Sequence, residues 1–600
     1  MSVHATYSYD VLIVGAGGAG LRAAIEAANS GVSVGLICKS LLGKAHTVMA
    51  EGGIAAALRN VWKEDSWQVH FRDTMRGGKL LNNWRMAQLL AQEAPSRVKE
   101  LEAWGALFDR TADGRILQRN FGGHQYPRLA HVGDRTGLEM IRTLQDRSVQ
   151  QKNIDVHMEC TVVRLLKDGD RISGAFGYWR NTGNFVLFKA KSVVIATGGV
   201  GKAWKITSNS WEYTGDGQSL AMWAGADLID MEFVQFHPTG MVWPPSVRGI
   251  LVTEGVRGDG GTLKNKAGER FMFNYIPEFF KGETADNEAE ADRWYQDKKN
   301  NRRTPDLLPR DEVARAINSE VKAGRGSPHG GVFLDICTRR PADYIRRRLP
   351  SMYHQFKELA DVDITRDPME VGPTCHYIMG GVRVDADSTA ATVPGLFAAG
   401  EAAGGMHGSN RLGGNSLSDL LVFGRRAGLH AALYAKNLGG RLQVDAGEVE
   451  KIARETLEPF SRTTGENPYV IQFELQDIMQ DLVGIIRKED ELKQALQKIE
   501  ALKARAKKVG VGGGRVYNPG WHTALDLRSL LTVAECCAMA ALERKESRGG
   551  HTREDHPYTD DTWGTVNVVQ KQGADGSTSL RREPLPKMPD ELKALFQERK

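Results

Sequence analysis

A strand-like apolar run leads directly into a glycine loop near the start of the chain. Residues 10–14 read DVLIV, and the loop GAGGAG that follows has G-x-G-x-x-G spacing before an alanine-rich stretch at 21–29. In this pattern the first two glycines allow a tight turn and a close approach to a pyrophosphate, and the third allows a helix to pack on the strand. The sequence therefore predicts a βαβ dinucleotide-binding unit whose phosphate contacts come from Gly15, Ala16, Gly17, Gly18, Ala19 and Gly20.

The end of the second predicted strand bears on which dinucleotide the loop binds. Residues 32–38 form an apolar run, and the segment 37–40 reads ICKS, without an Asp or Glu. Because an acidic residue at this position usually binds the ribose 2′-hydroxyl of NAD, its absence argues against NAD. Taken alone, the loop leaves the identity of the dinucleotide open.

The composition indicates an ordinary globular chain without nucleic-acid or metal chemistry of its own. The 79 basic and 74 acidic residues give a net charge of +5, which is too slight a bias to indicate nucleic acid. The six cysteines include no C-x-x-C pair, which argues against an iron–sulfur cluster or zinc site. They also give no disulfide framework, which fits a reducing cytosol. Because no apolar run approaches the roughly eighteen residues of a membrane helix, we expect any membrane attachment to depend on partner chains.

The pattern of strands predicts an α/β protein in which one domain is interrupted by another. The predicted strand at 192–196 runs into a glycine turn, and the segment 393–401 repeats this pattern before a helical run at 416–432. Two unrelated α/β domains are the alternative. The predicted domains are a discontinuous nucleotide-binding domain of 1–240 and 356–435, an insertion of 241–355, a helical domain of 436–545 and a small C-terminal domain of 546–600.

Two further segments have a distinctive character. Between 491 and 509 apolar residues recur at helical spacing, with Lys and Glu between them, which indicates helix packing (Leu492, Leu496, Ile499, Leu502). The segment 276–306 is highly charged and is expected to form a surface loop or short solvated helices.

Six short motifs follow the glycine loop along the chain. A histidine in Ala45-His46-Thr47 stands just after the second predicted strand. The other five are QFHPTG at 235–240, LVTEGVRG at 251–258, DEVAR at 311–315, PTCHY at 373–377 and GSNRLGGNSL at 408–417. Each motif alone is weak. In this order, from Val11 to about His551, the chain closely resembles the flavoprotein subunits of succinate dehydrogenase and fumarate reductase.

The resemblance implies a fold and a cofactor. The fold is a Rossmann-like FAD-binding domain interrupted by an α+β capping domain, followed by a helical domain and a small C-terminal domain. FAD is expected to be attached covalently through His46, and the segment 546–551 is expected to lie ordered against the body. Besides the glycine loop, the implied cofactor-binding residues are Lys39, Ser40, Thr47, Gly52, Gly53, Asp216, Glu401, Ser416 and Leu417.

The matched motifs also imply a site for a four-carbon dicarboxylate. Such a substrate carries two negative charges, so its site needs hydrogen-bond donors and positive charge at both ends. Arg315 is expected to exchange a proton with the substrate, and Glu254 and Arg257 are expected to relay protons to solvent. The implied substrate-binding residues are His237, Thr253, His376, Arg411 and Phe121.

The predicted function is interconversion of succinate and fumarate in the catalytic subunit of a membrane-bound succinate:quinone oxidoreductase. Because the chain has no cluster ligands of its own, we expect an iron–sulfur subunit to exchange electrons with it. We also expect one or more membrane anchor subunits to carry the quinone site. The chain is then expected to lie peripherally at the cytoplasmic face of the cell membrane.

Other functions remain open at this point. L-aspartate oxidase shares most substrate motifs but holds FAD non-covalently and lacks the histidine, so His46 counts against it. A fumarate reductase with attached haem domains would need a C-x-x-C-H motif, which is absent. A non-catalytic FAD-binding scaffold would have no need of the substrate residues. Glu51 hints that the main direction is fumarate reduction, because a negative charge near the flavin lowers its potential.

Overall fold

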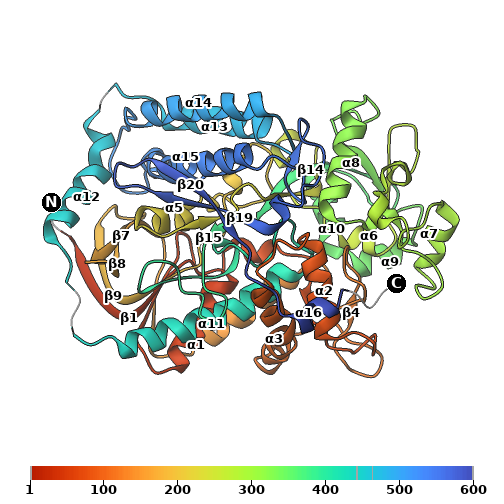
Figure 1. Cartoon of the computed structure of the whole chain (residues 1–600), viewed down its shortest axis with the longest axis horizontal. Helices are drawn as coiled ribbons and strands as arrows, with labels where there is room; N and C mark the ends of the chain where they lie inside the picture. Colours follow the sequence, from red (N-terminus) through yellow and green to blue (C-terminus); the bar gives the residue numbers. More distant parts are fainter. Residues whose placement is uncertain (1–2, 441–442, 463, 597–600) are drawn as a thin grey trace.

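The largest sheet in the computed structural model, which describes residues 3–440, 443–462 and 464–596, combines distant parts of the chain (Figure 1). Its strands are β1 (Ala5–Val14), β2 (Val34–Ile37), β6 (Ile154–His157), β7 (Cys160–Asp168), β8 (Arg171–Trp179), β9 (Phe185–Ile195) and β16 (Leu396–Ala398). The order is β6-β2-β1-β9-β8-β7, with β16 pairing on β9. β1 is parallel to β2 and β9, and β16 is parallel to β9. The predicted α/β fold is confirmed.

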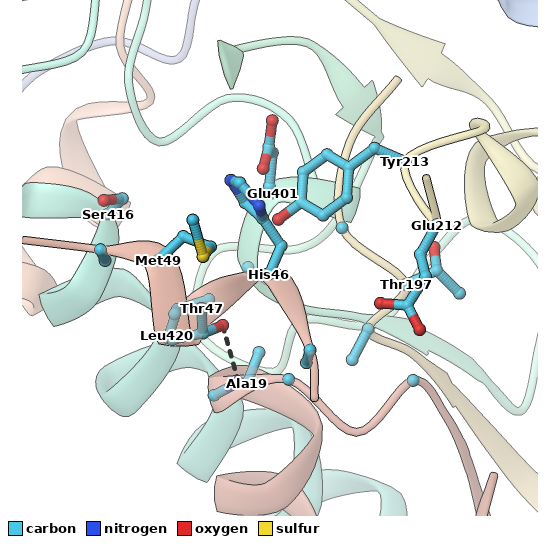
Figure 2. Close-up of a pocket in the computed structure, with 18 of the residues that line it drawn as sticks. Ala19, His46, Thr47, Met49, Thr197, Glu212, Tyr213, Glu401, Ser416 and Leu420 are labelled. Carbon is cyan, nitrogen blue, oxygen red and sulfur yellow. Dashed lines mark hydrogen bonds between the residues drawn. The ribbon is translucent and has the colours of Figure 1, made fainter. Parts of the chain in front are cut away.

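The glycine loop joins β1 to helix α1 (Gly18–Asn29) at the carboxyl end of β1. Gly15 has a φ of +111°, and a Cβ at this position would lie 2.2 Å from the carbonyl oxygen of Ala196. Only glycine fits this conformation and this close approach. The backbone N–H of Gly18 donates to Oγ1 of Thr47 at 3.2 Å, which fixes the segment after β2 against the start of α1 (Figure 2).

Helix α11 (Asn415–Asn437) is the helix predicted over 416–432. It packs on α1, and both helices contact β1 and β9. A Cβ at Gly424 would lie 2.7 Å from the carbonyl oxygen of Ala19, so the small residue lets the two helices approach closely. The segment that follows β16 therefore covers the same sheet as the helix that follows β1.

A second sheet lies in the capping region, which is drawn mainly in green in Figure 1. The strand order is β11-β14-β13-β12, and all pairings are antiparallel. Because β11 and β14 belong to this sheet, the predicted boundaries at 240 and 356 divide it. The strands are β11 (Val234–Met241), β12 (Thr262–Lys264), β13 (Val332–Asp335) and β14 (Met369–Ile378), and the helices are α6 (Gly255–Gly258), α7 (Glu288–Trp294), α8 (Arg310–Lys322), α9 (Ala342–Arg348) and α10 (Pro350–Ala360).

The charged segment 276–306 forms short helical turns on the capping region. Trp294 at the end of α7 is buried, which anchors the segment. Arg302 pairs with Glu290 at 2.7 Å and with Asp286 at 2.9 Å. The helical pieces are η5 (Glu278–Phe280), α7 and η6 (Pro305–Leu307).

In the helical part of the chain, helix α14 packs against two of its neighbours. α14 contacts both α13 and α15, and its predicted apolar stripe faces the core, with Leu492, Ile499 and Leu502 buried. The helices are α12 (Ala446–Leu457), α13 (Pro468–Leu482), α14 (Glu489–Ala506) and α15 (Pro519–Glu543). Among the helices of the described ranges, none combines the length and the apolar character needed to cross a lipid bilayer.

The C-terminal strands complete a third sheet with strands from the nucleotide-binding part. The order is β15-β10-β19-β20, with antiparallel pairing at each step. The predicted C-terminal domain therefore shares a sheet with the nucleotide-binding part through β19 and β20. The strands are β10 (Leu228–Ile229), β15 (Gly381–Val382), β19 (Val566–Gln572) and β20 (Thr578–Pro584), and α16 (Asp590–Ala594) follows them.

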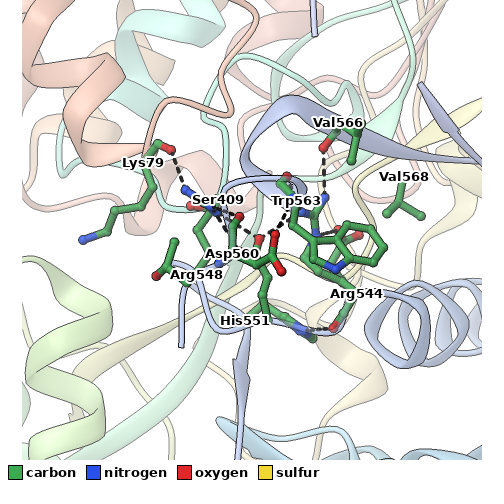
Figure 3. Close-up of polar contacts among 12 residues, drawn as sticks. Lys79, Ser409, Arg544, Arg548, His551, Asp560, Trp563, Val566 and Val568 are labelled. Atoms are coloured by element: carbon green, nitrogen blue, oxygen red, sulfur yellow. Dashed lines mark hydrogen bonds and ion pairs between the residues drawn. The ribbon is translucent and has the colours of Figure 1, made fainter. Parts of the chain in front are cut away.

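A buried ionic cluster fixes the segment between α15 and β19 (Figure 3). Arg544 pairs with Glu232 at 2.6 Å and with Glu546 at 3.1 Å, and all three side chains are fully buried. Arg548 reaches the same Glu546 at 2.9 Å, and the ring of His551 donates to the carbonyl oxygen of Arg544 at 3.0 Å. The expectation that residues 546–551 lie ordered against the body is confirmed.

Replacing Arg544 with methionine is expected to lower the free energy of unfolding by about 3–5 kcal/mol, because the buried Glu232 loses its ion-pair partner and Glu546 loses one of its two. Arg454→Met is the matched control, since Arg454 is exposed and lies 4.0 Å from Glu450. The control should change stability by less than about 1 kcal/mol. Urea denaturation of both variants measures the difference, and equal stability would contradict a structural role for the cluster.

Candidate active site

One large cavity runs from the glycine loop to the capping region, and most of the predicted site residues line it. Figure 2 shows the part of the cavity around His46, Tyr213 and Glu401. Its walls come from the carboxyl ends of β1, β2 and β9, from the start of α11 and from β11 and β14. Gly20, Arg257 and Arg315 lie outside the lining. The predicted residues that line the cavity are Gly15, Ala16, Gly17, Gly18, Ala19, Lys39, Ser40, His46, Thr47, Gly52, Gly53, Phe121, Asp216, His237, Thr253, Glu254, His376, Glu401, Arg411, Ser416 and Leu417.

The glycine-loop end of the cavity fits the diphosphate of a dinucleotide. The first turn of α1 opens into the cavity, so its backbone N–H groups and the positive end of the helix dipole favour an anion there. Gly20 does not line the cavity, but it lets the start of α1 pack closely against the glycine loop. A Cβ at this position would lie 1.8 Å from the carbonyl oxygen of Gly15.

Gly20→Ala is therefore expected to lower the free energy of unfolding by about 1–3 kcal/mol and to reduce the fraction of chains that carry FAD. The absorbance ratio at 450 and 280 nm, about 450 nm being the usual flavin band, measures the loading. Gly439→Ala is the control, because a Cβ there meets no atom of the described chain within 4 Å. Full loading of the Gly20 variant would contradict the steric argument.

Lys39 ties the cofactor end of the cavity to the helical part of the chain. Its Nζ lies 2.8 Å from Asp216 and 2.8 Å from Asp526, and it donates to Oγ1 of Thr214 at 3.0 Å. Burial opposes the charge on Lys39, but the two carboxylates outweigh this and raise its pKa. Asp526 lies on α15 and was not predicted as a site residue.

His46 begins the short helix η1 (His46–Met49) and lies beside Tyr213, with the ring centroids 4.6 Å apart (Figure 2). The backbone N–H of Ser210 donates to its Nδ1 at 3.3 Å. Burial lowers the pKa of His46 to about 4, so the imidazole is neutral near neutral pH. A neutral ring keeps a nitrogen lone pair available for bonding.

Glu401 is the main acidic group in the middle of the cavity. Its Oε1 accepts the backbone N–H of Ile378 at 3.1 Å. Burial raises its pKa to about 8, so the carboxyl holds its proton near neutral pH. A protonated carboxyl can donate one hydrogen bond and accept others, which suits a hydroxyl of a bound ligand.

Arg411 is held rigidly at the far end of the cavity. Its Nη1 donates to Oγ of Ser416 at 2.9 Å, and its Nη2 donates to Oε1 of Gln235 at 3.0 Å. Its guanidinium also stacks over the ring of Tyr377, 4.2 Å from the centroid. Burial and the nearby Arg310 lower the pKa of Arg411 to about 10, so it remains a cation near neutral pH.

Two histidines lie next to Arg411. The rings of His237 and His376 are 5.1 Å apart, and Nδ1 of His376 lies 2.7 Å from Oγ of Ser208. Burial and the surrounding cations lower the pKa of both histidines well below the usual range, so both are neutral hydrogen-bonding groups. Thr253 and Phe121 line the same part of the cavity.

Glu254 joins two arginines at the capping side of the cavity. Its Oε2 accepts Nε–H of Arg310 at 2.8 Å, and Nη2 of Arg257 lies 3.9 Å from the same oxygen. Its Oε1 accepts the backbone N–H of Gly122 at 2.6 Å. Burial would raise the pKa of Glu254, but the two guanidinium groups outweigh it and lower the pKa.

Arg315, which was predicted to exchange a proton with the substrate, does not line the cavity. Its guanidinium pairs with Glu312 at 2.6 Å and donates to the carbonyl oxygen of Gly549 at 3.1 Å. Arg315 thus fastens α8 to the C-terminal segment. Arg310, at the first position of the same helix, lines the cavity instead. Five residues turn an α-helix by about 140° beyond a full turn, so the two side chains leave α8 in different directions.

Comparison with known proteins places the chain in a family. A model described as an FAD binding domain matches residues 10–417, and one described as fumarate reductase flavoprotein C-term matches residues 472–594. A fumarate reductase (CoM/CoB) subunit of Methanothermobacter marburgensis is 43% identical, covering 93% of this chain and 96% of that protein. The succinate dehydrogenase flavoprotein subunit of Coxiella burnetii is 37% identical, covering 94% and 95%. This chain belongs to the succinate dehydrogenase and fumarate reductase flavoprotein family.

A solved structure of the Mycobacterium smegmatis protein Sdh1 in complex with UQ1 extends the comparison. The chain in that structure is 60% identical to this chain. The match covers 99% of this chain and 97% of that one, with a TM-score of 0.86. As a member of the succinate dehydrogenase and fumarate reductase flavoprotein family, the chain is an FAD-dependent oxidoreductase. The glycine loop and the polar groups around it fit that cofactor.

Sequence reasoning missed several residues of this flavoprotein site. Arg310 stands one position before the DEVAR motif, and Pro309 directly before it marks the helix start at which a side chain can face the cavity. Tyr213 had no motif signal, because an isolated tyrosine is common in any core. Tyr377 ends the PTCHY motif but was given no role. The lining residues missed by the prediction include Glu212, Tyr213, Arg310, Tyr377 and Leu420.

Proposed function

We propose that this chain is the catalytic flavoprotein subunit of a succinate:quinone oxidoreductase and interconverts succinate and fumarate. The observation that carries the proposal is the convergence of Arg310, Arg411 and neutral histidines on one wall of the cavity that also contains the glycine loop. Two arginines, which both donate to Oε1 of Gln235, and several other donors suit a small molecule with two carboxylates.

Arg411 binds one carboxylate of the substrate in this proposal. Its contacts with Gln235, Ser416 and Tyr377 support the role, because they fix the guanidinium before substrate arrives. His237, His376 and Thr253 provide hydrogen bonds to the substrate carboxylates, and Phe121 packs against the carbon chain between them.

Arg310 exchanges the proton at the substrate carbon, and Glu254 and Arg257 continue the path toward solvent. The bond of 2.8 Å from Arg310 to Glu254 supports this order, since a proton acceptor lies directly behind the arginine. Arginine is an unusual acid because its ordinary pKa exceeds about 12. Burial lowers the pKa of Arg257, which favours proton release along the path.

FAD is attached covalently through His46 in this proposal, and when bound it supplies hydride transfer to or from the substrate carbon. The place of His46 in the cavity wall and its neutral imidazole support the attachment. The glycine loop holds the diphosphate. Lys39, Glu401 and the start of α11 position the rest of the cofactor.

Electrons pass from this chain to an iron–sulfur subunit, and membrane anchor subunits with a quinone site hold the assembly. The absence of any C-x-x-C pair in the sequence supports a separate chain for the clusters. The solved relative is described in complex with UQ1, which supports a quinone-linked assembly. The chain then lies peripherally at the cytoplasmic face of the membrane.

Glu51→Gln is expected to shift the flavin midpoint potential by less than about 30 mV, which is about 1.4 kcal/mol for a two-electron couple. Burial, with the nearby Asp134, raises the pKa of Glu51 well above its usual range. The carboxyl is then neutral near neutral pH. Glu51 therefore places no negative charge near the flavin, and it no longer indicates that fumarate reduction is the main direction. Spectroelectrochemistry measures the potential, and a rise well above 30 mV would show that Glu51 is ionised.

Anaerobic substrate reduction separates the proposal from its alternative. Succinate should bleach the flavin absorbance of the purified, FAD-loaded protein, and fumarate should restore it. L-aspartate should leave the spectrum unchanged. Bleaching by L-aspartate without a response to succinate would overturn the proposal in favour of an aspartate-oxidase-like enzyme. The ratio of the two rates with artificial dyes reports the preferred direction.

A further inference from the structure

A second cavity is lined in part by β4 (Gln118–Arg119) and α6. Its volume is about 260 Å³, and among the described residues it shares no lining residue with the main cavity. Figure 1 places β4, α6 and α9 in the same part of the molecule. The charged segment 276–306 closes one side of this cavity with Tyr295 and Lys298.

The lining of the second cavity is strongly cationic. Its charged members in the described chain are four cations and one carboxylate, Asp259, which leaves a clear excess of positive charge. Two tyrosines add hydroxyl groups. The lining residues with charge or hydroxyl groups are Arg119, Asp259, Tyr295, Lys298, Arg340, Tyr344 and Arg348.

Arg119 brings an unused donor into this cavity. It is only 7% exposed, and its Nε and Nη2 donate to the carbonyl oxygens of Gly52 at 2.7 Å and Glu51 at 2.6 Å. Its Nη1 has no hydrogen-bond partner among the described residues, nor has Nε of Arg348. Buried donors are rarely left unpaired, because each one loses its hydration without a replacement.

The other cations are only partly compensated. Arg340 donates through Nε to the carbonyl oxygen of Asp259 at 2.7 Å, and Arg348 reaches the Asp259 carboxylate at 3.3 Å. Burial, with a contribution from the nearby Arg303, lowers the pKa of Lys298 to about 8. Among the described lining residues, Asp259 is the sole carboxylate beside these cations.

We propose that this second cavity is a binding site for a small oxyanion that carries two or more negative charges. Guanidinium groups match the geometry of carboxylate and phosphate oxygens, and three of them line one small space. A divalent cation is disfavoured, because Asp259 is the sole carboxylate in the described lining. The site lies outside the substrate cavity and goes beyond the function proposed above.

The bound anion would connect two parts of the fold. Arg119 comes from β4, whereas Arg340 and Arg348 come from the capping region at α9 and just before it. An oxyanion between them holds the capping region against the segment that carries Phe121. Arg119 also binds the backbone of Glu51 and Gly52, which line the main cavity. An anion bound in the second cavity would therefore help to fix the shape of the main cavity.

Isothermal titration of the FAD-loaded protein tests the site, with inorganic phosphate as one probe and citrate as the other. The site variants are Arg348→Met and Lys298→Met, and each has an exposed neighbour as its matched control, Arg347→Met and Lys299→Met. Each site variant should weaken binding at least about tenfold, because one charge-assisted hydrogen bond is lost. The control variants should bind as the unaltered protein does. Two independent variants keep the test valid if one fails to fold.

The outcomes separate the sources of the anion. Binding of phosphate that both site variants weaken supports a phosphate-type ligand, and the same result for citrate supports a polycarboxylate. The titrations are repeated in saturating fumarate, so that binding at the proposed substrate site is removed from the signal. No binding of either probe, or equal binding by site and control variants, would overturn the proposal. Neither of these results would bear on succinate oxidation.

Discussion

Replacing Arg310 with glutamine is expected to lower the rates of succinate oxidation and fumarate reduction by about 10²–10⁴-fold. The reason is that Arg310 lines the cavity and bonds directly to Glu254, so its loss removes the proposed proton carrier and its contact with the proposed path. FAD loading should stay unchanged, because Arg310 belongs to α8 of the capping region. Steady-state rates in both directions, divided by the concentration of bound flavin, measure the effect.

Arg315→Gln is the matched control, since it removes the same group from the same helix. Arg315 bonds to the C-terminal segment at Gly549 and Thr552, away from the cavity, and its loss should change turnover by less than about tenfold. The comparison decides which arginine of α8 handles the proton. Normal turnover by the Arg310 variant, together with loss of turnover in the Arg315 variant, would return the role to Arg315.

His46→Ser is expected to remove all flavin from the acid-denatured polypeptide while FAD still binds to the folded protein. The glycine loop, Lys39 and Glu401 remain in the variant, and they hold the cofactor without a covalent bond. A covalent bond to the ring raises the flavin potential, so succinate oxidation should fall more than fumarate reduction. In-gel flavin fluorescence after acid precipitation, together with rates in both directions, measures these effects.

His354→Ser is a suitable control, because His354 is exposed on α10 and lies outside the cavity. Its flavin should stay on the polypeptide, and peptide mapping should place the adduct on the peptide that contains His46. Flavin released completely from the fully loaded, unaltered protein would disprove the covalent attachment. Equal losses in the two directions would show that the bond does not raise the potential.

The sequence predicted the parts of the site that depend on local geometry. The glycine loop requires particular φ values and close backbone contacts, so residues 15–20 specify their own conformation. Arg411 and Ser416 stand in one continuous motif, and the structure joins them by a hydrogen bond of 2.9 Å. Motifs of this kind indicate a site before any tertiary contact is known.

The choice between Arg310 and Arg315 depended on the rotation of one helix. Arg310 stands directly before the DEVAR motif and Arg315 ends it, and the sequence does not record which face of α8 meets the cavity. That face is set by the packing of α8 against β11, where Gln235 lies within 3.4 Å of Arg310. A choice between two identical side chains five positions apart therefore requires the tertiary structure.

The sequence by itself determined the family and the nucleotide-binding βαβ unit, and most of the site residues that it predicted line the cavity. The tertiary structure alone decided three things: that β11 and β14 extend the capping sheet past its predicted limits, that Arg310 occupies the site, and that four cations enclose a second cavity. The physical reason is the distance in sequence between the residues that determine each feature. Turns and helix starts are fixed by neighbouring residues, whereas cavities form where β4, α6 and α9, distant in sequence, pack together.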